Sequence, residues 1–221
     1  MQTTHLTEES DPFCLAPAAA AELLAGAPWH RYAVIGDSLS AGTGDASPGY
    51  ADLGWSDRLA GTLRRVRSDL AYLNTAEIGA TTAQTLETQI ERMTAFRPDL
   101  LHVPSGPNDL LRRTPDFAAI EATLRRMYDL AASTGAQLTT FTLGRAYVVP
   151  VFADWHERVA ALNDVVRGLA AEYHAVVVDM WDHPINDRAT LLSADGIHFA
   201  TSGHAVLAAE MVKALARVLG R

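Results

Sequence analysis

The sequence contains almost no cysteine: Cys14 is the only one among 221 residues. A single cysteine excludes an intrachain disulfide and fits a reducing compartment. The sequence also lacks a run of about 18 apolar residues, the length that a membrane-spanning helix needs. Segment Met1–Asp11 has neither the basic start nor the apolar run of a secretory signal. We therefore expect a soluble, cytoplasmic protein.

Positive charge is scarce as well. The chain has 18 Lys and Arg against 26 Asp and Glu, a formal net charge of −8. This acidic balance disfavours binding to nucleic acid or to an anionic membrane, and it leaves the oligomeric state open. Hydrophobic residues make up 48% of the chain, enough for the core of one domain.

Five short apolar runs predict the strands of a sheet. Each is continuous rather than alternating, which is typical of parallel strands covered on both faces. The runs are Tyr32–Ile35, Leu70–Leu73, Leu100–Val103, Leu138–Leu143 and Val176–Val178.

Segments with helical spacing lie between these runs, for example Leu59, Leu63 and Val66 after Trp55. Similar segments follow Thr81, span residues 120–130 and 159–169, and end the chain at 206–218. Strand–helix alternation of this kind predicts an α/β fold with an open, five-stranded parallel sheet. We expect residues 1–30 to form an N-terminal extension with an Ala-rich surface helix over Ala16–Ala27, and residues 31–221 a single catalytic domain.

Ligands of open α/β sheets bind beyond the carboxyl ends of the strands, so reactive residues are expected after the apolar runs. Ser38 follows the first run within Gly36–Gly42 (Gly-Asp-Ser-Leu-Ser-Ala-Gly). A serine here is a candidate nucleophile, although it could simply cap the next helix.

Two further runs are followed by candidate anion-binding groups. Gly79 lies just before a predicted helix, where free backbone N–H groups can point at an anion, although it could be an ordinary loop glycine. Asn108 lies in a Gly-Pro turn after the third run, and an asparagine side chain is a known type of oxyanion donor. A plain turn residue is the alternative for Asn108.

A serine nucleophile needs an imidazole base, which a carboxylate can orient. Asp195 and His198 supply such a pair after the last run, and Asp99 and His102 are a second pair with the same spacing. His198 is the better candidate because His102 lies inside an apolar run, where a core position is simpler. His204 is expected to be structural, and His156 and His174 fall in or at the end of the fourth long helix.

Taken together, four blocks resemble the SGNH hydrolases, also called GDSL esterases. They are Gly36–Ser40, Gly79, Gly106–Asp109 and Asp195–His198. The resemblance runs from about Tyr32 to Gly203. It implies a flavodoxin-like three-layer α/β/α fold and a serine hydrolase that cleaves small-molecule carboxylic esters or thioesters without metal or cofactor.

The resemblance also implies roles for five residues. Ser38 attacks the acyl carbonyl, His198 acts as general base and then general acid, and Asp195 orients His198. The oxyanion is held by the backbone N–H groups of Ser38 and Gly79 and by the side chain of Asn108. The acyl and alcohol groups are expected to contact loops Thr43–Trp55, Asp109–Asp116, Gly144–Trp155 and Trp181–Ser193.

Three alternatives stay open at this point. The same site could transfer the acyl group to an acceptor other than water, and the same fold could bind a ligand without catalysis. A nucleotide-binding site is the third, because Gly42 and Gly44 follow the first strand. It is disfavoured since residue 47 is Ser47, where the dinucleotide-binding fingerprint requires glycine.

Overall fold

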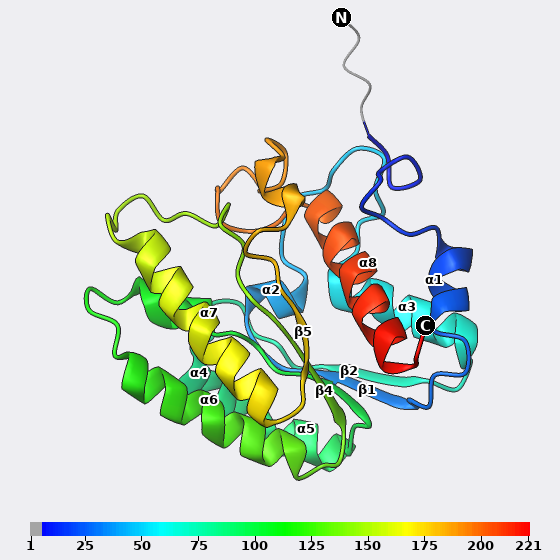
Figure 1. The fold of residues 1–221 in the computed structure, drawn as a ribbon, viewed down its shortest axis with the longest axis horizontal. Helices are drawn as coiled ribbons and strands as arrows, with labels where there is room; N and C mark the ends of the chain where they lie inside the picture. Colours follow the sequence, from blue (N-terminus) through cyan, green and yellow to red (C-terminus); the bar gives the residue numbers. More distant parts are fainter. Residues whose placement is uncertain (1–5) are drawn as a thin grey trace, which may run out of the picture.

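The computed structural model describes residues 6–221 and contains one sheet of five parallel strands (Figure 1). The strands are β1 (Arg31–Val34), β2 (Ala71–Asn74), β3 (Leu100–His102), β4 (Gln137–Phe141) and β5 (Val176–Val178). Their spatial order is β2-β1-β3-β4-β5, the flavodoxin-like order, which reverses direction between β1 and β3. The predicted fold class is confirmed.

The described residues form eight α-helices and two short 3₁₀ helices. They are α1 (Pro17–Leu23), α2 (Ser38–Ala41), α3 (Trp55–Val66), α4 (Thr82–Thr88), α5 (Ile90–Phe96), η1 (Pro107–Leu111), α6 (Phe117–Ala132), α7 (Trp155–Glu172), η2 (Pro184–Asp187) and α8 (Thr201–Val218). Within this described part, none of the helices combines the length and apolarity needed to cross a membrane.

The sheet is the middle of three layers (Figure 1). Helices α1, α3 and α8 pack together on one face, and α4 to α7 cover the other. Tyr32 and Val34 lie in the same apolar core as Trp55, whereas Ala33 and Ile35 lie in the other core with Leu124. Neighbouring residues of one strand are thus buried on opposite faces, which explains why the apolar runs are continuous.

The structure differs from the expected elements in two ways. The single helix expected after Thr81 is two helices, α4 and α5, because the chain bends at Gln89 (φ −110°). Helix α2 and the 3₁₀ helices had no counterpart in the sequence pattern. Segments of four or five residues are too short to display a helical period.

The N-terminal extension packs against the rest of the chain; its residues 1–5 lie outside the described residues. Helix α1, shorter than the expected Ala16–Ala27, contacts α3 and α8. Ahead of it, the buried Asp11 carboxylate accepts hydrogen bonds of 2.7 and 2.9 Å from Arg188 and of 2.8 Å from the Tyr50 hydroxyl. These bonds connect the extension to the loops after α2 and η2.

Candidate active site

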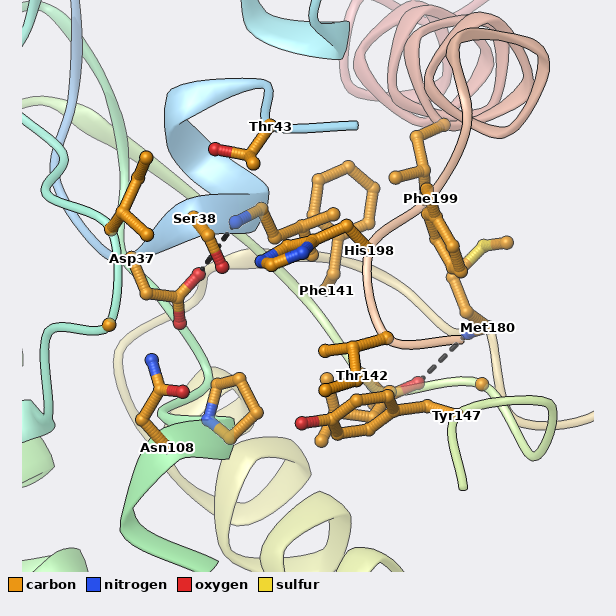
Figure 2. Close-up of a pocket in the computed structure, with 18 of the residues that line it drawn as sticks. Asp37, Ser38, Thr43, Asn108, Phe141, Thr142, Tyr147, Met180, His198 and Phe199 are labelled. Carbon is orange, nitrogen blue, oxygen red and sulfur yellow. Dashed lines mark hydrogen bonds between the residues drawn. The ribbon is translucent and has the colours of Figure 1, made fainter. Parts of the chain in front are cut away.

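A pocket of about 210 Å³ opens at the edge of the sheet where the strands end (Figure 2). Ser38 follows β1, Gly79 follows β2 and Asn108 follows β3, and all three line the pocket together with His198. The pocket thus lies at the point where the strand order reverses, the usual ligand site of such sheets. The structure brings together four of the five residues singled out in the sequence, and the fifth, Asp195, contacts His198.

Ser38 is the first residue of α2, and the turn before it is tightly packed. Gly36 has φ +140°, and a side chain there would place a Cβ 2.5 Å from Ser40 Oγ. The Asp37 carboxylate caps α2 by accepting the Leu39 N–H at 3.0 Å. Capping is therefore done by Asp37, not by Ser38, and the Ser38 side chain lines the pocket instead.

The buried Asp37 carboxyl also lines the pocket. Burial raises its pKa to about 6, although hydrogen bonds from the backbone N–H groups of Leu39 and Ser40 favour the charged form. The site thus contains a second carboxyl group in addition to that of Asp195, and this one, on Asp37, can change its charge near neutral pH.

Gly79 lies in a tight turn in which the Ala80 N–H donates to the Glu77 carbonyl at 3.1 Å. Its φ of +79° favours glycine, while the space around its Cα is open. Conformation rather than crowding therefore explains the glycine. The turn is fixed to the segment before Ser38 because the Glu77 N–H donates to the Gly36 carbonyl at 3.0 Å.

Asn108 is held in η1 by contacts with the start of α4. Its Nδ2 donates to the Ala80 carbonyl at 3.0 Å, which leaves the second N–H of the amide for a ligand. The buried Asp109 accepts the Thr82 N–H at 2.8 Å and the Thr82 hydroxyl at 3.1 Å. The turns that carry Gly79 and Asn108 are thereby joined at one side of the pocket.

His198 is oriented by Asp195. Asp195 Oδ2 lies 2.6 Å from His198 Nδ1, and Oδ1 accepts the backbone N–H groups of Ile197 (2.8 Å) and His198 (3.0 Å). These bonds, the imidazole bond first, lower the pKa of Asp195 to about 2, so it is a carboxylate at neutral pH. A carboxylate accepts a hydrogen bond from the N–H at Nδ1, which keeps the proton on that nitrogen and leaves the lone pair on Nε2.

The Ser38 side chain points toward the imidazole of His198 across the mouth of the pocket (Figure 2). The two side chains face one another, but in the described part of the chain no hydrogen bond joins Ser38 Oγ to the imidazole of His198. Catalytic hydrogen bonds are often long in free enzymes and tighten with substrate, so this geometry is compatible with a nucleophile and its base.

Comparison with known proteins agrees with this geometry. Residues 34–206 match the model of the GDSL-like Lipase/Acylhydrolase family. The chain belongs to this family. It is accordingly a carboxylic ester hydrolase. No curated protein sequence matches the chain significantly.

Solved structures share the fold. LAE5, an alpha/beta hydrolase enzyme from the metagenome of Lake Arreo, Spain, has a TM-score of 0.69 and 22% identity, over 86% of this chain and 95% of its own. TesA has a TM-score of 0.68 and 24% identity, over 84% and 97%. Axe2, an acetylxylan esterase from Geobacillus stearothermophilus, has a TM-score of 0.67 and 20% identity, over 86% and 94%.

Two other histidines of this GDSL-like hydrolase, His102 and His204, are buried among structural contacts. His102 is buried on β3 against Trp55, and burial lowers its pKa to about 3. Asp99 does not orient it, because the carboxylate of Asp99 accepts the backbone N–H groups of His30 (2.7 Å) and Arg31 (2.8 Å). The second Asp–His pair of the sequence is therefore not a catalytic pair.

His204 is buried at the start of α8 and bound on both ring nitrogens. Nε2 lies 3.1 Å from the Thr43 carbonyl, and Nδ1 accepts the Trp55 N–H at 3.4 Å. Burial lowers its pKa to about 4. The structural role expected for His204 agrees with these bonds. His156 is an exposed residue of α7, and His174 follows the end of that helix with φ +52°.

The glycines of the nucleotide-binding alternative serve chain packing. Gly42 ends α2 with φ +80°, and a Cβ there would lie 2.7 Å from Gly54 Cα. A Cβ on Gly44 would lie 1.7 Å from the Phe199 carbonyl oxygen. These close approaches explain both glycines without a phosphate.

Gln89 and part of the pocket wall gave no signal in the sequence pattern. The buried Gln89 side chain accepts the Gly36 N–H at 2.7 Å and donates to the Gly36 carbonyl at 2.8 Å. Of the four loops expected around the substrate, three contribute to the pocket and Trp181–Ser193 does not. The apolar lining residues are Leu39, Ile78, Pro107, Leu111, Phe141, Leu143, Tyr147, Met180, Ile197, Phe199 and Leu207.

Proposed function

We propose that this protein hydrolyses small-molecule carboxylic esters or thioesters through a covalent acyl intermediate on Ser38. Ser38 Oγ attacks the acyl carbonyl carbon while its proton passes to His198 Nε2. The bond to the leaving alcohol or thiol then breaks, and His198 returns the proton to that group. Water, deprotonated by the same nitrogen, then attacks the acyl carbon, the bond to Ser38 Oγ breaks, and His198 returns the proton to Oγ as the acid leaves.

The observation that carries this proposal is the convergence of Ser38, Gly79, Asn108 and His198 on one pocket, with Asp195 bound to His198 Nδ1. The carboxylate keeps the proton on Nδ1 and stabilises the imidazolium that forms after proton transfer. No metal or organic cofactor takes part in the reaction as written.

The negative charge that develops on the carbonyl oxygen requires donors. We assign this role to the backbone N–H groups of Ser38 and Gly79 and to the free amide N–H of Asn108. Such donors are in place before the reaction, so no free energy is spent on orienting them when the charge develops. One side-chain donor contributes about 2.7–4 kcal/mol of transition-state stabilisation.

The lining of the pocket supports an apolar acyl group. Phe141, Leu143, Met180 and Leu207 are all at most 7% exposed and line the pocket together. An acyl chain gains about 0.8 kcal/mol per buried methylene, whereas a sugar would leave hydroxyl groups unpaired against these residues. Turnover of p-nitrophenyl esters from acetate to palmitate, beside acetylated sugars, measures this preference.

The decisive experiment is covalent labelling with a fluorophosphonate, which requires an activated serine. We expect the wild-type chain to be labelled at Ser38, and Ser38→Ala and His198→Ala to lose labelling and about 10⁶-fold in kcat, as in well-studied triads. Ser38→Ala with most of its esterase activity would overturn the assignment. A wild-type chain that is never labelled would favour a non-catalytic binding protein.

Acyl transfer to an alcohol or amine shares the acyl-enzyme, so it is an outcome of the same assay. Turnover with a competing acceptor separates the two, because transfer produces a new ester or amide in proportion to acceptor concentration. A cytoplasmic location and the lack of nucleic-acid partners stay predictions from Cys14 and the net charge.

A further inference from the structure

Ser38 and His198 are 160 residues apart in sequence. The segment after α2 contacts both the backbone of Ser38 and the loop that carries His198. The Thr43 N–H donates to the Ser38 carbonyl at 3.0 Å, so the segment starts from the nucleophile itself. We propose that Gly44 and Asp45, in segment 43–47, are positioning residues that hold the loop of His198 against Ser38. The inference rests on the proposed function.

Asp45 binds the loop of His198 through three groups. Its N–H donates to Ser193 Oγ at 2.8 Å, its Oδ2 accepts the Ala194 N–H at 2.7 Å, and its carbonyl accepts the Thr201 N–H at 2.9 Å. The bound residues flank Asp195 and His198 on both sides. Asp45 therefore fixes the two ends of the segment that carries the base.

Ser193, which Asp45 contacts, also forms a backbone hydrogen bond with His198 across the loop. The Ser193 N–H donates to the His198 carbonyl at 2.7 Å, and the Gly196 N–H donates to the Ser193 carbonyl at 2.9 Å. A shift of Ser193 or Ala194 is thereby passed to the backbone of His198. The Ser38 side chain faces the imidazole across the pocket, so a small shift of His198 changes whether the Ser38 hydroxyl reaches it in the substrate complex.

Gly44 sets the distance between the two segments. A Cβ at this position would lie 1.7 Å from the Phe199 carbonyl oxygen, a backbone atom of the residue after the base. Figure 2 shows Thr43 at the end of α2 and Phe199 beside His198 around the same pocket. Any side chain at position 44 must therefore push the chain of His198 and Phe199 away from α2.

Two neighbouring bonds continue the contact. The Ser47 N–H donates to Thr201 Oγ1 at 2.7 Å, and the Ser202 N–H donates to Ser47 Oγ at 3.2 Å. These bonds hold the start of α8 whether or not Asp45 keeps its side chain. Removing the Asp45 carboxylate is therefore expected to loosen the loop of His198 while the fold remains.

The test compares Asp45→Ala and Asp45→Asn with Asp116→Ala. An amide oxygen at position 45 still accepts the Ala194 N–H, so Asp45→Asn tests the hydrogen bond apart from the charge. Asp116 provides the matched control, because it does not line the pocket and its carboxylate also accepts a backbone N–H, that of Ala119 at 3.0 Å, at the start of α6. Steady-state kinetics, unfolding midpoints and fluorophosphonate labelling rates are measured for all variants.

We expect Asp45→Ala to lower kcat and the labelling rate about tenfold, with KM changed less than twofold. Asp45→Asn should recover kcat to within threefold of wild type, and Asp116→Ala should leave kcat unchanged even where it lowers the unfolding midpoint. Asp45→Ala that is labelled at the wild-type rate overturns the inference. Asp45→Asn as slow as Asp45→Ala also overturns it, since charge rather than the hydrogen bond would then matter.

Gly44→Ala gives a second, independent measurement. We expect it to be the slowest of the variants, and Gly61→Ala is its control because a Cβ on Gly61 meets nothing within 4 Å. Gly44→Ala with wild-type turnover contradicts the role of Gly44, and if it does not fold the Asp45 variants still decide. Failure of the proposed function is distinguishable, because wild type itself would then not be labelled.

Discussion

The side-chain amide of Gln89 binds both the N–H and the carbonyl of Gly36, 53 residues away in sequence. Gly36 begins the turn that presents Asp37 and Ser38, and Gln89 marks the bend between α4 and α5. One buried side chain thus fixes the turn of the nucleophile to the opposite helical layer.

We predict that Gln89→Met, which keeps a similar volume, lowers the free energy of unfolding by about 1–3 kcal/mol. The Gly36 N–H is left without its partner, whereas the Gly36 carbonyl still accepts the Glu77 N–H. Urea unfolding measures the loss, and kcat should fall because the turn before Ser38 loosens. Glu87→Met, an exposed change on α4, should leave kcat unchanged; an equal fall in both variants would argue against this role of Gln89.

The contacts of Gln89 show where prediction from the sequence stops. Tyr32–Ile35 and Val176–Val178 identify strands because burial on both faces is written in the local residue types. Ser38 and His198 could be proposed because each follows an apolar run, and parallel strands end at one edge. Gln89 and Asp45 gave no such signal, since their partners are backbone groups distant in sequence and any polar side chain on a helix or loop looks the same.

The same limit applies to charge. The sequence contains Asp37 within the first block, but its raised pKa depends on burial by surrounding layers. Asp195 was proposed to orient His198, and its low pKa depends first on the hydrogen bond with the imidazole and then on the loop geometry that directs two backbone N–H groups at Oδ1. The sequence shows which residues carry carboxyl groups, but the pKa of each carboxyl group depends on its surroundings in the fold.

We predict that Asp37→Asn stabilises the protein at pH 8 but not at pH 4. The pKa of Asp37 is raised from 3.8 to about 6 in the folded chain, so wild-type stability falls as pH rises from about 4 through 6. The full difference is about 3 kcal/mol, at about 1.4 kcal/mol per pKa unit. An asparagine oxygen can still accept the Leu39 N–H.

Urea unfolding of both chains from pH 4 to pH 8 checks this prediction, with Asp116→Asn as a control for a capping carboxylate at an exposed helix start. The advantage of Asp37→Asn should grow with pH and level off above 7. A difference that is the same at pH 4 and pH 8 would show that the carboxyl does not titrate between them.

We predict that Asn108→Ala lowers kcat by about 10²–10³ and changes KM little. The lost amide N–H stabilises the oxyanion more than the substrate carbonyl, so the effect falls on the transition state. The hydrogen bond to the Ala80 carbonyl is lost as well, and the unfolding midpoint reports how much of the effect is structural. A variant within fivefold of the wild-type kcat would mean that the backbone donors suffice.

The mouth of the pocket has apolar side chains that are open to solvent. Ile78, Leu111 and Ile197 line it and are 70%, 43% and 44% exposed. Ile78 lies in the loop after β2, Leu111 ends η1 after β3, and Ile197 lies in the loop before α8. An acyl chain longer than the pocket would continue over these residues and cover them.

Leu111→Ser should therefore lower kcat/KM about threefold to tenfold for long-chain p-nitrophenyl esters and less than twofold for the acetate, which does not reach the mouth. The expected size follows from about 0.8 kcal/mol, or about fourfold, per buried methylene. Val218→Ser is the matched control, because Val218 is 49% exposed at the end of α8, away from the pocket. If Leu111→Ser affects all chain lengths equally, Leu111 acts on the reacting group and the chain leaves the pocket by another side.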